Sequence, residues 1–205
     1  GSQLDIIRVP LKEKLLPGGS TTLVLDYSVK LPDDKFTRYG VSKFGEYKLR
    51  YWFIAPGVYD GEWQVYSNRN TDDFYMPPSE FLINFHFPKS YRLFTDLNTA
   101  TEVELQEKKI VRLEGKNRKN APIYLTKYEG FKSVVTDKLE VITDLKDKKV
   151  NSHVKALQID RITHFLDQKL GSYPFEKLLV SDADYRNNPV YGLNQLPDFI
   201  DPFPN

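Results

Sequence analysis

The chain has three histidines, the side chains best suited to bind zinc or to act as a general base near neutral pH. They are His86, His153 and His164. None belongs to an H-E-x-x-H pattern, and no two have the i, i+4 spacing that places both ligands on one helix turn. We expect all three to be solvent-exposed or satisfied by neighbours. The sequence therefore predicts no metal site and no catalytic residue in this chain.

Other motifs that carry chemistry are absent or incomplete. There is no G-x-S-x-G, and Pro17-Gly18-Gly19-Ser20 lacks the Lys and the following helix of a P-loop. Asp182-Ala183-Asp184 could bind a divalent cation, but two carboxylates are few ligands, which favours a solvated loop. The aromatic run over residues 51–53 could stack on sugars or bases, although burial in a strand is favoured for a continuous apolar run.

Composition describes an ordinary globular protein with a bias toward β structure. The 205 residues are 40% hydrophobic and include 13 Tyr and 13 Phe, which favour strands. With 29 basic and 28 acidic residues, nothing indicates nucleic acid as a partner. No apolar run has the roughly 18 residues of a membrane span. Cysteine is absent, which excludes disulfides and thiolate metal sites.

The elements that must position any site are predicted mainly as short strands. Leu23 to Leu31 and Phe81 to Phe87 alternate with period two, and further strands are expected over 47–54, 63–66, 91–94, 101–105, 110–113, 123–128 and 139–143. Turn chemistry separates them, including Gly115 to Asn120. This pattern predicts a mainly β fold, with an antiparallel β-sandwich or saddle domain over residues 1–148.

The pattern changes near residue 148. Asn151 or Ser152 can cap a helix that runs to about Leu170, and Gly171 suits its C-terminal cap. A short strand over 178–180, a polar loop and a strand over 190–196 follow. Residues 149–205 are thus predicted as a short α+β segment, one helix and two strands, of a truncated second domain.

The segment from Gly171 to Asp182 resembles the entry to the catalytic domain of the gluzincin aminopeptidases, the group that contains aminopeptidase N and leukotriene hydrolase. In that family, a helix ending in Gly is followed by Y-P-x-x-K-L, a strand, a loop and a strand with G-A-M-E-N. Tyr173-Pro174 and Lys177-Leu178 match. The stretch resembles a divergent, bacteroidete-type branch. Residues 77–81 resemble more loosely the family's D-E-P-x-x-K-A-T-F stretch.

The resemblance implies tentative substrate-binding residues at Gly192, Leu193, Asn194 and Gln195, in the position of G-A-M-E-N. The family's Glu there binds the substrate's α-amino group by a charge-assisted contact. Gln195 can accept a hydrogen bond but supplies no counter-charge, so strict aminopeptidase specificity is not implied. The alternative role for these four residues is a cleft-edge strand that lines the cleft without contacting substrate.

The resemblance further implies the non-catalytic N-terminal portion of a zinc metallopeptidase. Zinc, H-E-x-x-H and the third ligand would belong to the full-length parent, and this fragment would bind none. Its partners would be its own downstream catalytic domain and, in the parent, a peptide substrate. An unpaired strand over 190–196 could also form an edge-strand dimer. We expect an exported parent: periplasmic, envelope or secreted. Two alternatives stay open, a β-sandwich binding or adhesion module and a zinc-less peptidase-like scaffold.

Overall fold

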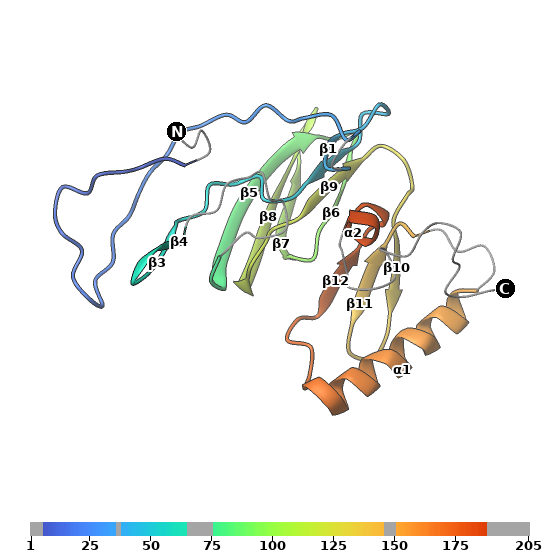
Figure 1. The fold of residues 1–205 in the computed structure, drawn as a ribbon. Helices are drawn as coiled ribbons and strands as arrows, with labels where there is room; N and C mark the ends of the chain where they lie inside the picture. The colour runs from blue at the N-terminus through green and yellow to red at the C-terminus, as the bar shows by residue number, and fades with distance from the viewer. Residues whose placement is uncertain (1–5, 36–37, 65–75, 146–150, 188–205) are drawn as a thin grey trace. The chain divides into compact units, whose positions relative to one another are not determined.

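The described part of the chain is mainly β, with mostly antiparallel strand pairs and two helices (Figure 1). The computed structural model describes residues 6–35, 38–64, 76–145 and 151–187. Two compact units divide the chain: residues 1–30 with 52–77 form one, and residues 31–51 with 78–205 form the other. The predicted fold class is confirmed. The predicted domain boundary at 148 lies outside the described residues.

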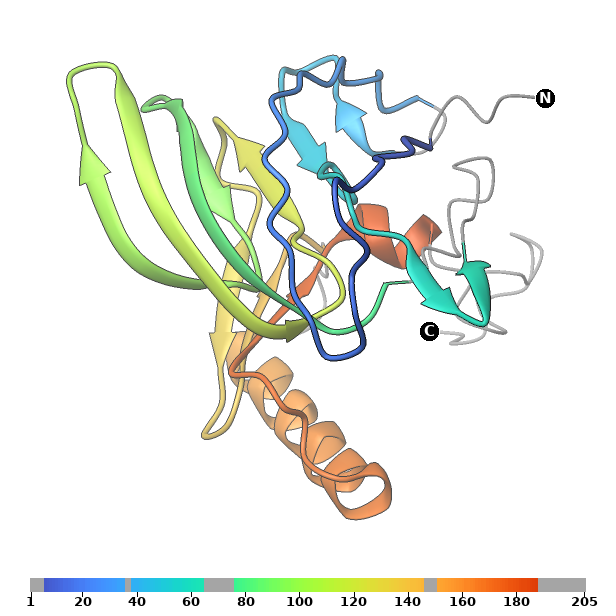
Figure 2. The ribbon, with the colours of Figure 1, turned by 90° about the vertical axis from the view of Figure 1, so that its left-hand side faces the viewer.

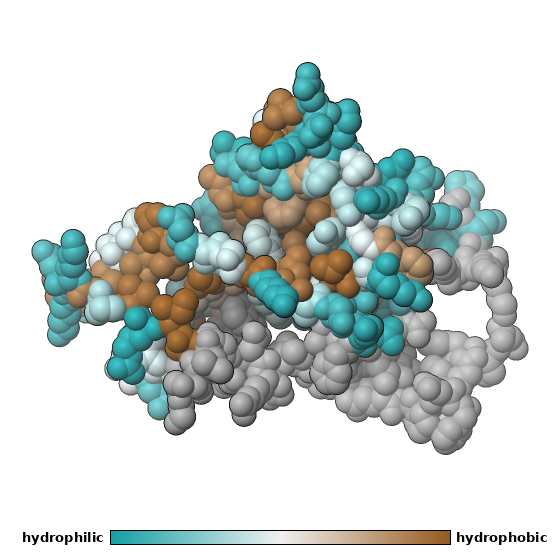
Figure 3. Space-filling model, turned by 90° about the horizontal axis from the view of Figure 1, so that it is seen from above, coloured by the Kyte–Doolittle hydropathy of each residue, from teal (hydrophilic) through white to brown (hydrophobic). Residues whose placement is uncertain are grey.

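The described residues of the first unit contain one hairpin and a long extended segment. Strands β3 (Val58–Asp60) and β4 (Glu62–Gln64) pair antiparallel around Gly61, whose φ of 73° suits the turn. The predicted strand over 23–31 is wrong, because these residues join no ladder. Val24 is 86% exposed, and hydrophobic atoms are visible at the surface in Figure 3.

The second unit contains a sheet with the two longest described strands, β5 and β8, in the order β5-β8-β7, which we call the long sheet. Its strands are β5 (Ser79–Pro88), β8 (Lys108–Arg118) and β7 (Asn98–Glu104), all antiparallel and curved together (Figure 2). The alternation predicted over 81–87 is confirmed, with Phe87 buried and His86 exposed. The turn predicted from Gly115 is wrong, because β8 continues to Arg118 through a bulge opposite Ser79 and Phe81.

A second sheet has the order β1-β2-β9-β6. It consists of β1 (Gly40–Val41), β2 (Tyr47–Leu49), β9 (Ile123–Thr126) and β6 (Arg92–Phe94). The core of the second unit is built mainly from residues of β8 and β9 and from the segment just before β7. Its fully buried members include Leu97, Leu113, Ile123 and Tyr124. Tyr51 lies outside any strand with a left-handed φ of 49°, so the predicted strand over 47–54 ends early.

The third sheet joins residues on both sides of the predicted boundary. Strands β10 (Lys132–Val135) and β11 (Glu140–Thr143) form a hairpin, and β12 (Lys177–Val180) pairs parallel with β11. Helix α1 (Ser152–Leu170) lies beside β10 (Figure 1). Asn151 caps it by accepting from the Val154 amide, and Gly171 ends it with φ of 92°, as predicted.

A short helix, α2 (Asp182–Asn187), replaces the loop predicted around Asp182 and Asp184. Its first turn contains both aspartates, where a helix end favours negative charge. Ser181 precedes it, and its Oγ accepts the Asp184 amide at 2.9 Å. The sequence Ser181-x-x-Asp184 is therefore a helix start, similar to a capping box.

Candidate functional site

In the described part of the chain, four polar side chains gather around the Asp184 carboxylate. Tyr124 on β9 and Ser181 donate to Asp184 Oδ2 at 2.7 and 2.5 Å, and their own oxygens lie 2.9 Å apart. Tyr39, just before β1, donates to Asp184 Oδ1 at 2.6 Å. We call these residues, with Arg50, the Asp184 cluster.

Arg50 completes the cluster from the end of β2. Its Nη1 donates to the Tyr39 hydroxyl at 2.8 Å and lies 4.0 Å from Asp184 Oδ1. The guanidinium also lies over two rings, 5.4 Å from the centroid of Tyr39 and 4.9 Å from that of Tyr51. The Arg50 guanidinium therefore lies near the Asp184 carboxylate and also contacts the rings of Tyr39 and Tyr51.

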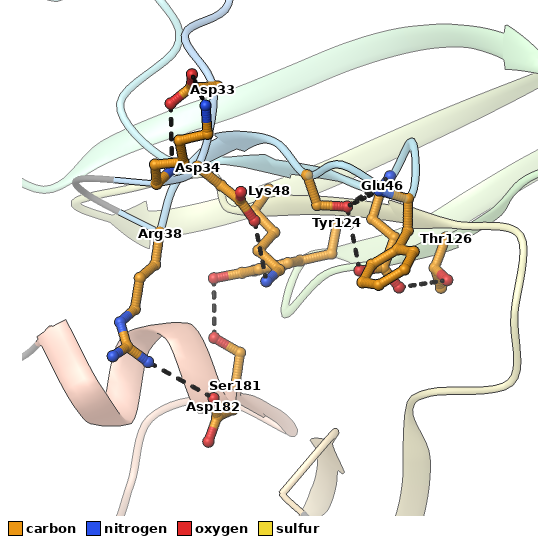
Figure 4. Close-up of polar contacts among 12 residues, drawn as sticks. Asp33, Asp34, Arg38, Glu46, Lys48, Tyr124, Thr126, Ser181 and Asp182 are labelled. Atoms are coloured by element: carbon orange, nitrogen blue, oxygen red, sulfur yellow. Dashed lines mark hydrogen bonds and ion pairs between the residues drawn. The ribbon is translucent and has the colours of Figure 1, made fainter.

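A second set of contacts holds the start of α2 beside this cluster. The Asp182 amide donates to Asp144 Oδ1 at 2.6 Å. Arg38 lies 3.9 Å from the Asp182 carboxylate, and Lys48 lies 3.9 Å from that of Asp34. Figure 4 shows Arg38 reaching Asp182 and Tyr124 reaching Ser181 from the sheet side.

Electrostatics keep the two phenols of the Asp184 cluster protonated. Burial raises the pKa of Tyr39 well above its ordinary value, and the negative charge of Asp184 raises it further. The same two causes, in the same order, raise the pKa of Tyr124. Both hydroxyls are hydrogen-bond donors to the carboxylate at any pH near neutrality, and neither can serve as a base.

The Asp184 cluster therefore anchors the start of α2, and its residues are not arranged as a catalytic site. Asp184 accepts three hydroxyl donors, and Ser181 has no histidine beside it. His86 is exposed on β5, while His153 and His164 lie on exposed positions of α1. Within the described ranges, no group of three or more His, Asp or Glu is arranged to hold a metal ion.

A third polar arrangement fixes the segment that precedes β12. Arg118, 6% exposed at the end of β8, donates to Asp96 through Nη1 at 3.2 Å and to the Asp96 carbonyl through Nη2 at 2.9 Å. Its guanidinium lies 3.5 Å from the centroid of the Phe175 ring. Phe175 is therefore held to the long sheet by a cation–π contact.

The predicted substrate-binding residues Gly192, Leu193, Asn194 and Gln195 lie outside the described residues. Asp184, which the sequence pattern suggested only as half of a weak cation motif, is instead the centre of an anchoring cluster. Tyr39, Arg50 and Tyr124 were not predicted. The local signal that could have identified the helix start is Ser181-x-x-Asp184, but no local signal identifies partners so distant in sequence.

None of the described helices combines the length and the apolar character needed to traverse a lipid bilayer. Comparison with known proteins adds no relative: no family model, no curated protein and no solved structure matches the chain.

Proposed function

We propose that this chain is the non-catalytic N-terminal portion of a zinc metallopeptidase of the gluzincin aminopeptidase type. In this role its sheets carry the first elements of the peptidase domain, pack on the rest of that domain and contribute one wall of the peptide-binding cleft. The observation that carries the proposal is the anchoring of the Phe175–Asp184 segment at both ends. This segment bears part of the family resemblance, and the anchors are Arg118 at one end and the Asp184 cluster at the other.

The exposed apolar side of α1 supports packing against further protein. Leu157 and Phe165 are 62% and 58% exposed, and Val154 and Ile162 lie near them on the helix surface at helical spacing. Ala156, Ile159 and Thr163 lie on another side of the helix and are less exposed. A helix that is apolar on two sides is typical of a position between two layers. We infer that the body of the peptidase domain covers the side with Leu157 and Phe165.

The zinc of such a peptidase would be bound by residues that lie beyond this chain. The described residues do not fit a zinc ion, since they contain no suitable cluster of His, Asp or Glu. The contribution of this chain would be positional. Gly192, Leu193, Asn194 and Gln195 would line the cleft, and Gln195 could accept a hydrogen bond from the substrate amino group without neutralising its charge.

Hydrogen exchange of α1 tests the packing part of the proposal. It should be compared between the 205-residue chain and the full-length natural protein, with strand β8 as the internal reference. We expect α1 amides to exchange more slowly in the full-length protein, because the apolar side with Leu157 and Phe165 is covered there. Equal exchange of α1 in both proteins would refute packing on a catalytic domain.

A binding module is the second candidate, and one observation favours it. Tyr59 and Trp63 are cross-strand partners on the β3–β4 hairpin, 64% and 65% exposed, with ring centroids 5.4 Å apart. Exposed aromatic pairs of this kind can bind ligands by stacking. Array screening would first identify a glycan or protein ligand of the chain. Trp63→Ala would then abolish binding of that ligand, whereas Phe44→Ala, which removes another exposed aromatic side chain, would leave binding unchanged.

A further inference from the structure

The β3–β4 hairpin presents two aromatic side chains to solvent on one of its faces. Tyr59 and Trp63 are directly opposed across the hairpin, and both are exposed. Their rings meet edge to face, with planes 69° apart, and ring faces stay open to solvent. The electron-rich face of an indole or phenol ring attracts a cation placed over it, and the indole does so most strongly. The aromatic face of the hairpin is therefore suited to a cationic group.

The turn of the same hairpin has two carboxylates and no cation. Asp60 and Glu62 are directly opposed on either side of Gly61, and both are exposed. Like charges at directly opposite positions of two strands repel each other. Within the described ranges, no ion pair includes either carboxylate. A cation bound at this turn would relieve the repulsion.

The residues around the hairpin have the same bias. Residues 52–64 contain no Lys, Arg or His, although the whole chain has 29 basic residues and a net charge of +1. The same stretch contains both tryptophans of the chain. Trp, Tyr and Arg are the residues that contribute most to the affinity of protein interfaces. The hairpin supplies the aromatic and acidic side of such an interface, and its charge is complementary to arginine.

The placement of the two groups favours an extended peptide over a small cation. Successive side chains of a strand face opposite ways, so the aromatic pair and the carboxylate pair belong to opposite faces. A ligand that reaches both pairs must cross the turn at Gly61. An extended segment with basic side chains at several positions can do so.

We propose that the β3–β4 hairpin is a docking surface for a partner protein that presents arginine residues in an extended segment. One guanidinium stacks on the Trp63 ring, and a second basic side chain of the partner lies beside the Asp60 and Glu62 carboxylates. Arginine suits both places, because its guanidinium is planar, weakly hydrated and able to pair with carboxylates. The inference names a ligand class for the second candidate function, and it does not depend on the peptidase assignment.

The test measures binding of a short fluorescent peptide of alternating Arg and Gly to the 205-residue chain by fluorescence anisotropy. Peptides with Lys or Glu in place of Arg, and a panel of neutral glycans, are compared with it.

Two variants of the chain are used in this test, Trp63→Ala and Asp60→Asn/Glu62→Gln. The second keeps both rings and the side-chain shapes should the first disturb the hairpin. Tyr128→Ala/Asp137→Asn is the matched control, because it removes an exposed ring and an exposed carboxylate from the second unit. In the described part of the chain β3 and β4 pair only with each other, so the test variants leave the ladders of the second unit intact.

We expect the Arg peptide to bind, and both test variants to weaken its binding about tenfold or more, as loss of a central interface contact does. The control should bind normally, the Lys peptide should bind more weakly, and added salt should weaken binding.

No binding of the Arg peptide to the unmodified chain would overturn the proposal, and so would binding that the Asp60→Asn/Glu62→Gln variant retains in full. Binding of a neutral glycan that requires Trp63 but neither carboxylate would overturn it in favour of a sugar ligand. The peptidase assignment fails or holds separately, through the zinc content and peptide hydrolysis of the full-length protein.

Discussion

The guanidinium of Arg118 lies 3.5 Å from the centroid of the Phe175 ring, which joins the end of β8 to the turn before β12. Arg118 is the more buried partner of an ion pair with Asp96, and one Asp96 oxygen and the Arg118 Nε have no partner among the described side chains. This contact attaches the segment from Gly171 to Asp182, which carries the family resemblance, to the sheet β5-β8-β7. The strength of that tie can be measured directly.

Arg118→Met should cost about 3 kcal/mol of unfolding free energy, because it leaves the Asp96 carboxylate buried without its cation. Burial already raises the pKa of Asp96 although Arg118 opposes the shift. Urea unfolding at neutral pH measures the loss. Arg112→Met is the matched control: Arg112 pairs with Glu114 at 3.1 Å on the exposed side, so its loss should cost less than about 1 kcal/mol. Equal losses in the two variants would mean that the Arg118 pair is not structurally important.

Gly115→Ala should destabilise the unit by about 1–3 kcal/mol through overpacking. A Cβ at Gly115 would lie 2.5 Å from Leu97 Cδ2 and 2.9 Å from Arg118 Cγ, and Leu97 is fully buried. Gly130→Ala is the control, because nothing lies within 4 Å of a Cβ there. Thermal unfolding of both variants distinguishes packing from a general effect of replacing glycine, and a Gly115→Ala protein as stable as Gly130→Ala would contradict the close approach of β8 to Leu97.

Stability should fall as pH rises above about 10, where tyrosines of the unfolded chain lose their protons. Burial and Asp184 raise the pKa of Tyr124, so the folded protein retains a proton that the unfolded chain releases. The difference favours unfolding more with each unit of pH. Tyr124→Phe removes this proton, and its stability should decline less steeply by about 1.4 kcal/mol per pH unit. Urea unfolding between about pH 9 and 11 gives both slopes; parallel slopes would show that the Tyr124 phenol titrates alike in both states.

Acid should stabilise the protein through Asp144. Burial raises the pKa of this carboxyl, and the neighbouring carboxylate of Asp182 contributes in the same direction. The folded state thus binds the proton more tightly than the unfolded state, so this stabilisation grows as pH falls through the folded pKa and is lost as pH rises through it.

Asp144→Asn removes that titration and keeps an oxygen that can accept from the Asp182 amide. Its stability relative to the original protein should be greatest at neutral pH and should shrink toward about pH 4. Thermal unfolding across this range is the measurement. A stability difference that is the same at every pH would show that the Asp144 carboxyl titrates alike in the folded and unfolded states, which would contradict the effect of burial on its charge.

Features encoded in neighbouring residues could be predicted from the sequence. The alternation of β5 depends only on successive side chains facing opposite ways, and the ends of α1 depend on Asn151 and Gly171. The same pattern over 23–31 was misleading, because alternation identifies two faces but not a partner strand. The residues from Gly115 onward have the composition of a turn, but they form a bulge within β8. Asn117 takes a left-handed φ of 56°, and the pairing with β5 resumes at Arg118.

The Asp184 cluster as a whole could not be predicted, because all of its members except Ser181 are distant from Asp184 in the sequence. Tyr39 and Asp184 are separated by 145 positions, and Tyr124 and Asp184 by 60. Each tyrosine belongs to an ordinary strand or turn pattern, and only the pairing of the strands brings the hydroxyls together. The helix start at residues 182–184 has a local signal in Ser181-x-x-Asp184, whereas the tyrosine partners of the Asp184 carboxylate depend on tertiary contacts.

The most direct test of the proposed function is the zinc content and peptide hydrolysis of the full-length natural protein, measured beside the 205-residue chain after dialysis. We predict about one zinc per molecule and hydrolysis of short peptides in the full-length protein, and neither in the chain, because the ligand set of zinc catalysis would lie beyond it. A full-length protein without stoichiometric zinc and without hydrolysis would contradict the peptidase assignment, as would zinc and hydrolysis that persist in the purified 205-residue chain.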